Sequence, residues 1–436
     1  MLFVTSASAR SSLRRLGLLA GMLLAVGGVR AAGPLTLDDA WRLAESTNPA
    51  LRAARAGLDA AEGQLRDASG ILYNNPQLST DQTRRRLTQA GLPDNRFHEQ
   101  SFGISQVFEI AGQAGHRHEA ASRDLAAVTE NIDEVRRQVR AEVEQRFFRV
   151  LALQRRIETE REALAAVDEA AVAVRKRVAV GEDSRLDGNL ATVEAERSRN
   201  QLAVLGEQLI QAQSELAAAL QLPAATLPEA VGELRAVLPA TTLDALLSAA
   251  RERPLLRALD HRKQAAHSRL NLERAAVYPD VTVGLSTGRE APYDAREPFT
   301  RLSVSIPLPL FRHNAAGIGK AATELTQAEI ERQSTERDVA AQVRALWQRL
   351  DSLQVRVKRF TESVLPALDE NRRLSSTAFR AGEIGLLQLL LVNRQLLDAR
   401  RDYLDAVGEF IQTRIALEQT AGWPAARADT FPEKNK

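Results

Sequence analysis

The stretch that decides the fold begins at Gly115, and residues 115–180 read GHRHEAASRDLAAVTENIDEVRRQVRAEVEQRFFRVLALQRRIETEREALAAVDEAAVAVRKRVAV. No proline occurs between Pro93 and Pro223. Apolar side chains recur at coiled-coil spacing, and Glu, Arg, Gln and Ala, which favour helices, lie between them. At about 1.5 Å of rise per residue, this stretch predicts a single helix roughly 100 Å long.

The chain is predicted to turn back at Gly181. A glycine that follows the basic run Arg175-Lys176-Arg177 is typical of a helix C-terminus. Asp183 or Ser184 can cap a second, returning helix, which completes a helical hairpin over residues 115–222. A globular core is much narrower than such a hairpin, so we expect a duct, a stalk or a scaffold.

Composition excludes several kinds of chemistry. The chain of 436 residues contains no cysteine, so it has no disulfide framework, no thiol nucleophile and no lipid attached to an N-terminal cysteine. His98-Glu99 and His118-Glu119 lack the second histidine of a zinc-protease motif. Two histidines one residue apart, His116 and His118, point away from each other on a helix and cannot share an ion there. We therefore expect no enzyme, no cofactor and no metal site.

Residues 1–31 are predicted to be a signal peptide. Arg10, Arg14 and Arg15 precede an apolar run at 16–26, and small residues follow it. An uncleaved helical anchor is the alternative. The segment holds four arginines and no acid, so its removal lowers the formal charge from +2 to about −2 and removes the case for nucleic-acid binding. No later segment is apolar enough for a transmembrane helix, so we expect strands to make any membrane crossing.

The rest of the chain is an internal repeat with an offset of about 200 residues. Thr36-Leu37-Asp38 returns as Thr242-Leu243-Asp244, and Gly181-Glu182 returns as Gly382-Glu383. Each repeat is expected to hold a helix, a β-hairpin (73–110 and 278–311) and a long helical hairpin (115–222 and 315–422). The predicted domains are the signal peptide (1–31), the first repeat (32–222), a linker (223–241), the second repeat (242–424) and a C-terminal tail (425–436).

The strands alternate apolar and polar residues, most clearly at Val281, Val283 and Leu285. Each runs for about ten residues, which is the length of a tilted transmembrane strand. Four strands cannot close a barrel, whereas three copies of the chain provide twelve. Hairpins exposed to water on a soluble protein are the alternative.

Together these features resemble the TolC family of outer-membrane efflux ducts, from about Leu35 to Pro424. The local motifs are Leu37-Asp38-Asp39-Ala40 with Asn48-Pro49, and the turns Val180-Gly181-Glu182 and Ala381-Gly382-Glu383. Each strand pair is followed by a helix that we expect to run for about 66 residues without interruption. Residues 106–117 resemble the strand-to-helix junction of the heavy-metal (CzcC-like) branch.

The resemblance implies a mainly α fold with a small β part: a trimeric α-barrel of coiled-coil helices joined to a transmembrane β-barrel of twelve strands. It implies an outer-membrane location with a long periplasmic extension, and as partners a periplasmic adaptor, an inner-membrane RND-type pump and outer-membrane lipid. The function is then that of a passive efflux duct. The alternatives for its cargo are metal ions, drugs and polypeptides. The alternative functions are a periplasmic adaptor (membrane fusion) protein and a soluble coiled-coil scaffold.

The candidate site residues lie at the two helix turns. Rings of carboxylates in a narrow entrance select for cations. In the family an acidic pair lies just inside the second turn, where this chain has Gln388 and Leu391, so we expect Asp187 to supply such a ring instead. The predicted entrance residues are Asp183, Asp187, Glu383 and Gln388. The turn residues predicted to contact an adaptor are Gly181, Ser184, Leu186, Gly382, Gly385 and Leu387. Solvated turn residues without a gating role are the alternative.

Overall fold

The computed structural model describes residues 34–88, 95–223, 225–290 and 297–422, so the predicted signal peptide and C-terminal tail lie outside the described residues. Across the described residues, no helix is both long and apolar enough to cross a membrane. The chain forms two compact units. Among the described residues, the first unit comprises residues 34–44, Val143–Leu234 and Glu362–Gly408, and the second comprises Glu45–Glu142, Arg235–Thr361 and residues 409–422.

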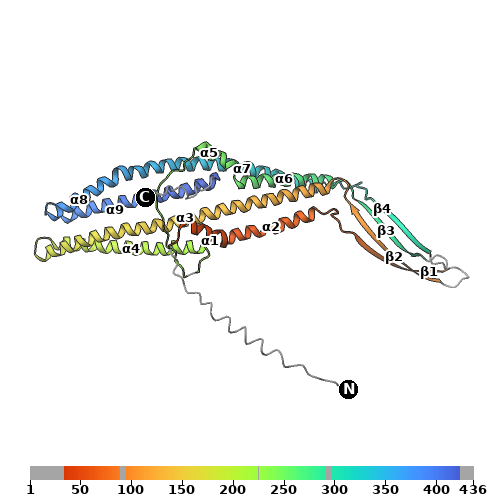
Figure 1. The fold of residues 1–436 in the computed structure, drawn as a ribbon, viewed down its shortest axis with the longest axis horizontal. Coiled ribbons are helices and arrows are strands. Elements are labelled where there is room, and N and C mark those ends of the chain that lie inside the picture. The colour runs from red at the N-terminus through yellow and green to blue at the C-terminus, as the bar shows by residue number, and fades with distance from the viewer. Residues whose placement is uncertain (1–33, 89–94, 224, 291–296, 423–436) are drawn as a thin grey trace, which may run out of the picture. The chain divides into compact units, whose positions relative to one another are not determined.

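The first half of the chain has the predicted order of elements (Figure 1). It contains α1 (Leu37–Thr47), α2 (Pro49–Ala68), β1 (Gln77–Leu87), β2 (Asn95–Phe108), α3 (Gln113–Ala179) and α4 (Arg185–Ala219). Asn48 separates α1 from α2, which begins at Pro49. The Asn48 side chain caps α2 by accepting a hydrogen bond from the backbone N–H of Ala50 at 2.9 Å, and proline suits the first helical position because it needs no donor there.

The second half repeats this order, which confirms the predicted internal repeat. It contains α5 (Leu243–Arg251), α6 (Pro254–Ala275), β3 (Val281–Glu290), β4 (Glu297–Ser305), α7 (Ala315–Arg359), the π-helical turn η1 (Phe360–Val364), α8 (Leu365–Arg380) and α9 (Leu386–Ala421). The exact division into repeats and a linker at 223–241 stays a prediction.

The expectation of an uninterrupted second long helix was wrong. The counterpart of α3 is broken into α7, η1 and α8, and Pro366 lies in the first turn of α8. Proline donates no backbone hydrogen bond, and its ring clashes with the carbonyl of the residue four positions earlier, here Glu362. A wider π turn directly before the proline relieves this clash. The first half has no proline at the matching place, so α3 runs unbroken for 67 residues.

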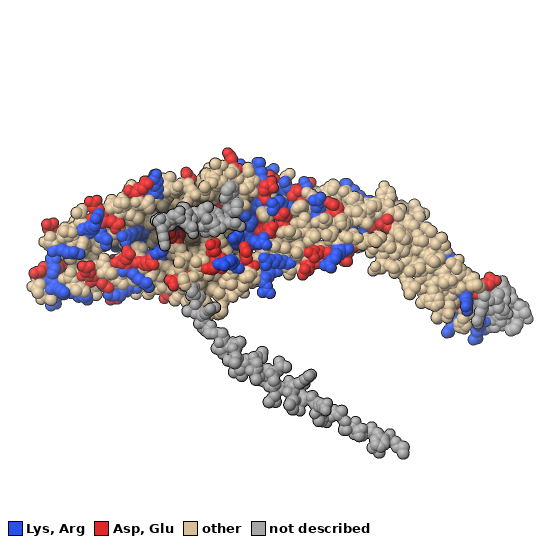
Figure 2. Space-filling view, viewed as in Figure 1, with Lys and Arg blue, Asp and Glu red and all other residues tan. Residues whose placement is uncertain are grey.

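The four strands form one antiparallel sheet in the order β1-β2-β3-β4. In register, Leu78 lies opposite Ile104, Ile104 opposite Leu285, and Leu285 opposite Leu302. β1 and β4 are the edges, so each has one side without a strand partner among the described residues. Few charged side chains lie on the strands in Figure 2, except near the end that carries the β1–β2 connection.

Each unit has its own apolar core. In the second unit Leu246, Val343, Leu350, Phe410 and Leu417 are fully buried and join α5, α7 and α9. The core of the first unit includes Val174, Ala191, Phe379 and Leu389, which come from α3, α4, α8 and α9. The two helical hairpins of the first unit therefore pack against each other near their turns.

Candidate functional site

Both helix turns end in the same hydrogen-bonded motif. Gly181 and Gly382 have positive φ angles of 81° and 75°, a conformation that glycine adopts without steric cost. The N–H of Glu182 donates to the carbonyl of Arg177, and the N–H of Glu383 donates to that of Ala378, each at 2.9 Å. These are the bonds of a Schellman motif, so both long helices end where glycine predicts.

The returning helix α4 begins with a capping box. Of the two predicted caps, Ser184 is the residue used: its Oγ accepts from the backbone N–H of Asp187 at 3.2 Å. In return the Asp187 carboxylate accepts from the Ser184 hydroxyl at 2.6 Å and from the Ser184 N–H at 3.3 Å. One carboxylate oxygen of the predicted entrance residue Asp187 is therefore hydrogen-bonded within the capping box.

Arg177 connects the first turn to the second hairpin. Its guanidinium forms an ion pair with Asp183 at 3.1 Å and approaches Glu182 at 3.8 Å. Its Cζ also lies 5.6 Å from the ring centroid of Phe379, near the end of α8. The structure thus brings the two predicted turns together and neutralises the charge of Asp183 locally.

The remaining candidates lie on the second turn or on the apolar surface of both turns. Glu383 is exposed, and its carboxylate has no hydrogen bond or ion pair to any residue that the structure describes. Gln388 is exposed as well, at the position that matches Asp187. Gly385 precedes α9 where Ser184 precedes α4, so that helix begins without a side-chain cap. Leu186 and Leu387 are 66% and 70% exposed, and offer apolar contacts to a partner.

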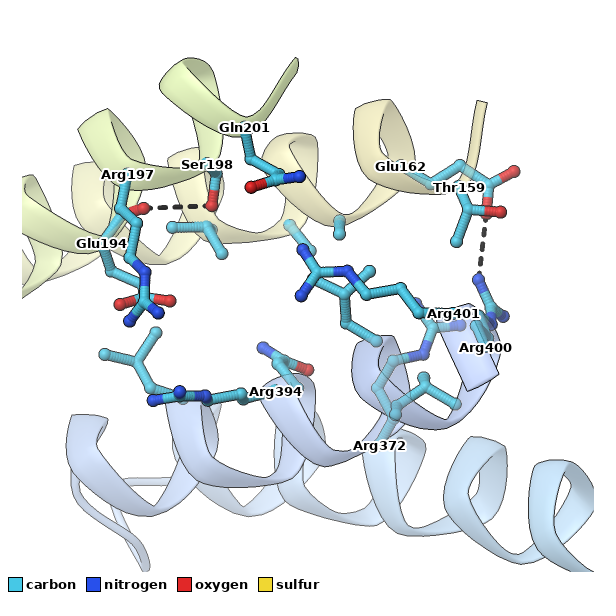
Figure 3. Close-up of a pocket in the computed structure, with 17 residues that line it drawn as sticks. Thr159, Glu162, Glu194, Arg197, Ser198, Gln201, Arg372, Arg394, Arg400 and Arg401 are labelled. Atoms are coloured by element: carbon cyan, nitrogen blue, oxygen red, sulfur yellow. Dashed lines mark hydrogen bonds and ion pairs between the residues drawn. The ribbon is translucent and has the colours of Figure 1, made fainter. Parts of the chain in front are cut away.

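A polar cavity of about 130 Å³ lies further along the same hairpins, between α3 and α4 on one side and α8 and α9 on the other (Figure 3). Five arginines line it: Arg197 comes from α4, Arg372 from α8, and Arg394, Arg400 and Arg401 from α9. Several of them are already paired with carboxylates. The cavity therefore lies within an ion-pair network that joins the two hairpins of the first unit.

The ion pairs of this network cross from one hairpin to the other. Glu160 of α3 is only 1% exposed and accepts two hydrogen bonds from Arg401, with an Nη2–Oε2 distance of 2.7 Å. The hydrogen bonds to Glu160 raise the pKa of Arg401. Arg400 bridges Glu162 of α3 and Asp369 of α8, each at 3.1 Å. Sequence reasoning missed these residues because the partners of the Glu160–Arg401 pair are 241 positions apart.

Among the residues that the structure describes, no group of three or more His, Asp or Glu side chains is arranged to hold a metal ion. A transported cation, in contrast, needs only transient contacts.

Two curated proteins resemble most of the chain. The cobalt-zinc-cadmium resistance protein CzcC of Cupriavidus metallidurans is 28% identical, over 90% of this chain and 91% of CzcC. The pyoverdine export outer membrane protein OpmQ of Pseudomonas putida is 25% identical, over 89% of this chain and 86% of OpmQ.

Solved structures show the same fold. CusC matches with a TM-score of 0.75 and 19% identity over 90% of this chain and 93% of its own. VceC of Vibrio cholerae matches with a TM-score of 0.75 and 20% identity over 88% of this chain and 96% of its own. A duplicated chain with four strands and two long helical hairpins therefore has the fold of a channel protein of the outer membrane.

Residues 41–221 and 246–423 match the family model described as Outer membrane efflux protein, and the chain belongs to that family. This confirms the resemblance predicted from the turns and the repeat. The protein is an outer-membrane efflux channel with a periplasmic helical extension. The family is one of channels and not of enzymes.

Proposed function

We propose that the protein is a passive duct through which heavy-metal cations leave the cell, without a catalytic step of its own. The likeness to CzcC carries this proposal, because it extends over 90% of this chain and 91% of a cobalt-zinc-cadmium resistance protein. The junction segment 106–117, which resembles the heavy-metal branch, agrees with it.

Metal sensitivity tests the cargo. A strain that lacks the gene should become sensitive to Co²⁺, Zn²⁺ and Cd²⁺, and the intact gene on a plasmid should restore resistance. Unchanged metal tolerance would contradict the proposal. If the strain loses export of a siderophore or a drug instead, the function is closer to that of OpmQ, whose name records pyoverdine export.

The working unit in this proposal is a homotrimer. The sheet ends in two unpaired edges, β1 and β4, and an exposed strand edge is unstable in lipid. Pairing β4 of one copy with β1 of the next satisfies both edges, and three copies give a closed sheet of twelve strands. Crosslinking of the protein in membranes should give trimers, and a monomer in detergent with protected strands would contradict this arrangement.

The partners in this proposal are a periplasmic adaptor and an inner-membrane RND-type pump. The adaptor contacts the turn residues Gly181, Ser184, Leu186, Gly382, Gly385 and Leu387. The chain has no cysteine, so Ser184→Cys and Gly385→Cys provide single crosslinking sites at the two turns. Both should crosslink to the adaptor, whereas Glu331→Cys on the exposed surface of α7 should not.

The entrance residues in this proposal are Asp183, Asp187, Glu383 and Gln388. They are expected to contribute unequally to cation selectivity. Asp183 is paired with Arg177 and Asp187 is held by Ser184, whereas Glu383 is exposed and unpaired among the described residues. Glu383→Gln should therefore lower the cation selectivity of single channels more than Asp187→Asn does. Equal selectivity in Glu383→Gln and the unmodified channel would remove Glu383 from the entrance.

A further inference from the structure

The cavity between the hairpins of the first unit contains more hydrogen-bond donors than acceptors. Of the described residues that line it, five are arginines and two, Glu162 and Glu194, are carboxylates. The amides of Gln201 and Asn393 add further polar groups. Because each guanidinium carries five N–H donors and no acceptor, the wall of the cavity favours a ligand that accepts hydrogen bonds.

Two of the five arginines already have carboxylate partners. Arg400 contacts Glu162 and Asp369, each at 3.1 Å. Arg401 is held by the buried Glu160. The guanidiniums of Arg400 and Arg401 therefore form the contact between the hairpins and are not counted as part of a ligand site.

The other three arginines are available to a ligand. The guanidiniums of Arg197 on α4 and Arg372 on α8 have no hydrogen bond or ion pair to any residue that the structure describes. Arg394 on α9 approaches only Asp398 within the described part of the chain, at 3.9 Å. All three side chains are exposed to solvent. In Figure 3, Arg197 and Arg394 lie at the same end of the cavity on opposite hairpins, so an anion there meets guanidiniums from both hairpins.

The charge of these groups indicates how many negative charges a ligand needs. Glu194, three residues before Arg197, also has no ion pair among the described residues. The groups of the wall without a close ion pair are therefore three arginines and one glutamate, which leaves an excess of two positive charges. Since like charges around one cavity repel each other, a ligand with two or more anionic groups is the best match.

The rest of the wall is apolar and gives room for a carbon skeleton. It contains the apolar side chains Ala163, Ala166 and Val167 of α3 and Leu390, Leu396 and Leu397 of α9. The volume of about 130 Å³ holds about ten water molecules, or a small organic acid of similar size. Apolar surroundings also strengthen the attraction between a guanidinium and a carboxylate. An organic acid with several carboxylates therefore fits this wall better than an inorganic anion.

We propose that the cavity binds a small organic di- or tricarboxylate. We call Arg197, Arg372 and Arg394 the arginine site. Arg197 binds one carboxylate of the ligand from the first hairpin, and Arg372 and Arg394 bind another from the second hairpin. Arginine suits this role because its planar guanidinium can donate two parallel hydrogen bonds to one carboxylate. The bound ligand adds contacts between the hairpins and stabilises the first unit. This inference does not depend on which cargo the duct carries.

Calorimetric titration of the purified full-length protein in detergent tests the site. Citrate is the tricarboxylate probe, pyrophosphate is the inorganic anion of similar charge, and acetate is the monovalent control, all at one pH and one ionic strength. Arg197→Gln and Arg372→Gln remove a guanidinium from either hairpin. Arg373→Gln is the matched control, because Arg373 is exposed, follows Arg372 on α8 and does not line the cavity. Thermal unfolding without ligand shows that each variant is folded.

We expect citrate to bind, acetate not to bind, and pyrophosphate to bind more weakly than citrate. Arg197→Gln and Arg372→Gln should each weaken citrate binding by about tenfold or more, because each loses a charge-assisted hydrogen bond. Arg373→Gln should bind citrate as the native protein does. Hydrogen exchange of the native protein should become slower at residues 194–201 of α4 and 390–401 of α9 when citrate is added, which locates the ligand without any substitution.

Three results would overturn the inference. If acetate has the same effect as citrate, the anion acts by screening and the cavity holds no specific ligand. If Arg373→Gln weakens citrate binding as much as Arg372→Gln does, the ligand lies elsewhere on the surface. If pyrophosphate binds more tightly than citrate through the same two arginines, the ligand is a phosphate compound and not a carboxylate. Each of these results leaves the proposed efflux function intact, because metal tolerance of the strain is measured separately.

Discussion

At the scale of the residue, the positive φ angle at each helix turn favours glycine. Any other L-residue at a φ near +80° costs about 1 kcal/mol. We expect Gly181→Ala, with φ 81° in the native turn, to lower the midpoint of thermal unfolding. Gly385→Ala is the matched control, because its φ is not positive and a Cβ there meets no atom within 4 Å. Equal midpoints for both variants would contradict the argument.

Glu418 gives a pH-dependent prediction. Burial raises the pKa of its carboxyl, and the charge of Arg414 only partly offsets this. Because the pKa is higher in the folded state than in the unfolded chain, this group lowers stability as the pH rises from the ordinary value toward the raised one. Glu418→Gln should therefore raise the unfolding midpoint at neutral pH. The difference from the native protein should vanish below about pH 4, where both forms are neutral. A difference that persists in acid would show another cause.

At the scale of the element, the two returning helices differ at their first residue. Ser184→Ala removes the capping box of α4 and should cost about 1 kcal/mol of stability. Gly385→Ser places serine three residues before Gln388, which completes the same motif on α9 and should stabilise it by about a few tenths of a kcal/mol. Hydrogen exchange of the first turn of each helix measures both changes, and slower exchange in Ser184→Ala would refute the cap.

The break in the second long helix also belongs to this scale. Pro366→Ala restores a backbone donor and removes the clash with the preceding turn, so η1 should become regular α-helix. The free energy of unfolding should rise by up to about 3 kcal/mol, and the unfolding midpoint should rise with it. Pro254→Ala is the control, because that proline lies at the first position of α6 and costs little there. Fast hydrogen exchange that persists at residues 360–364 would mean that the proline does not cause the π turn.

At the scale of the whole molecule, ion pairs between the two hairpins of the first unit hold these hairpins together. Arg401→Ala leaves Glu160 buried without its partner and should destabilise by about 3–5 kcal/mol. It should also accelerate hydrogen exchange along α3 and α9 and raise single-channel conductance. The double variant Arg401→Leu with Glu160→Leu removes both charges and should recover most of the stability. If Arg401→Ala is as stable as the native protein, the pair does not contribute to the free energy of unfolding.

The sequence by itself determined the elements, their order and their duplication, because these follow from local signals: coiled-coil spacing in 115–180, glycine at the turns, and alternation in the strands. The same signals indicated the family of outer-membrane efflux proteins. Two further features depend on local sequence as well: the capping box of Ser184 and Asp187, and the helix break at Pro366. The residues that cause each feature lie within a few positions of one another.

Only the tertiary structure decided which charges are paired. Glu160 meets Arg401 across 241 positions, and Arg177 reaches Phe379, because two hairpins pack side by side. No periodicity in one segment specifies its partner in another. The sequence therefore did not separate Asp183, which pairs with Arg177, from Glu383, which has no ion pair among the described residues. The register of the four strands, which aligns Gln82, Gln100, Arg289 and Pro298 in one row, likewise depends on hydrogen bonds between distant segments.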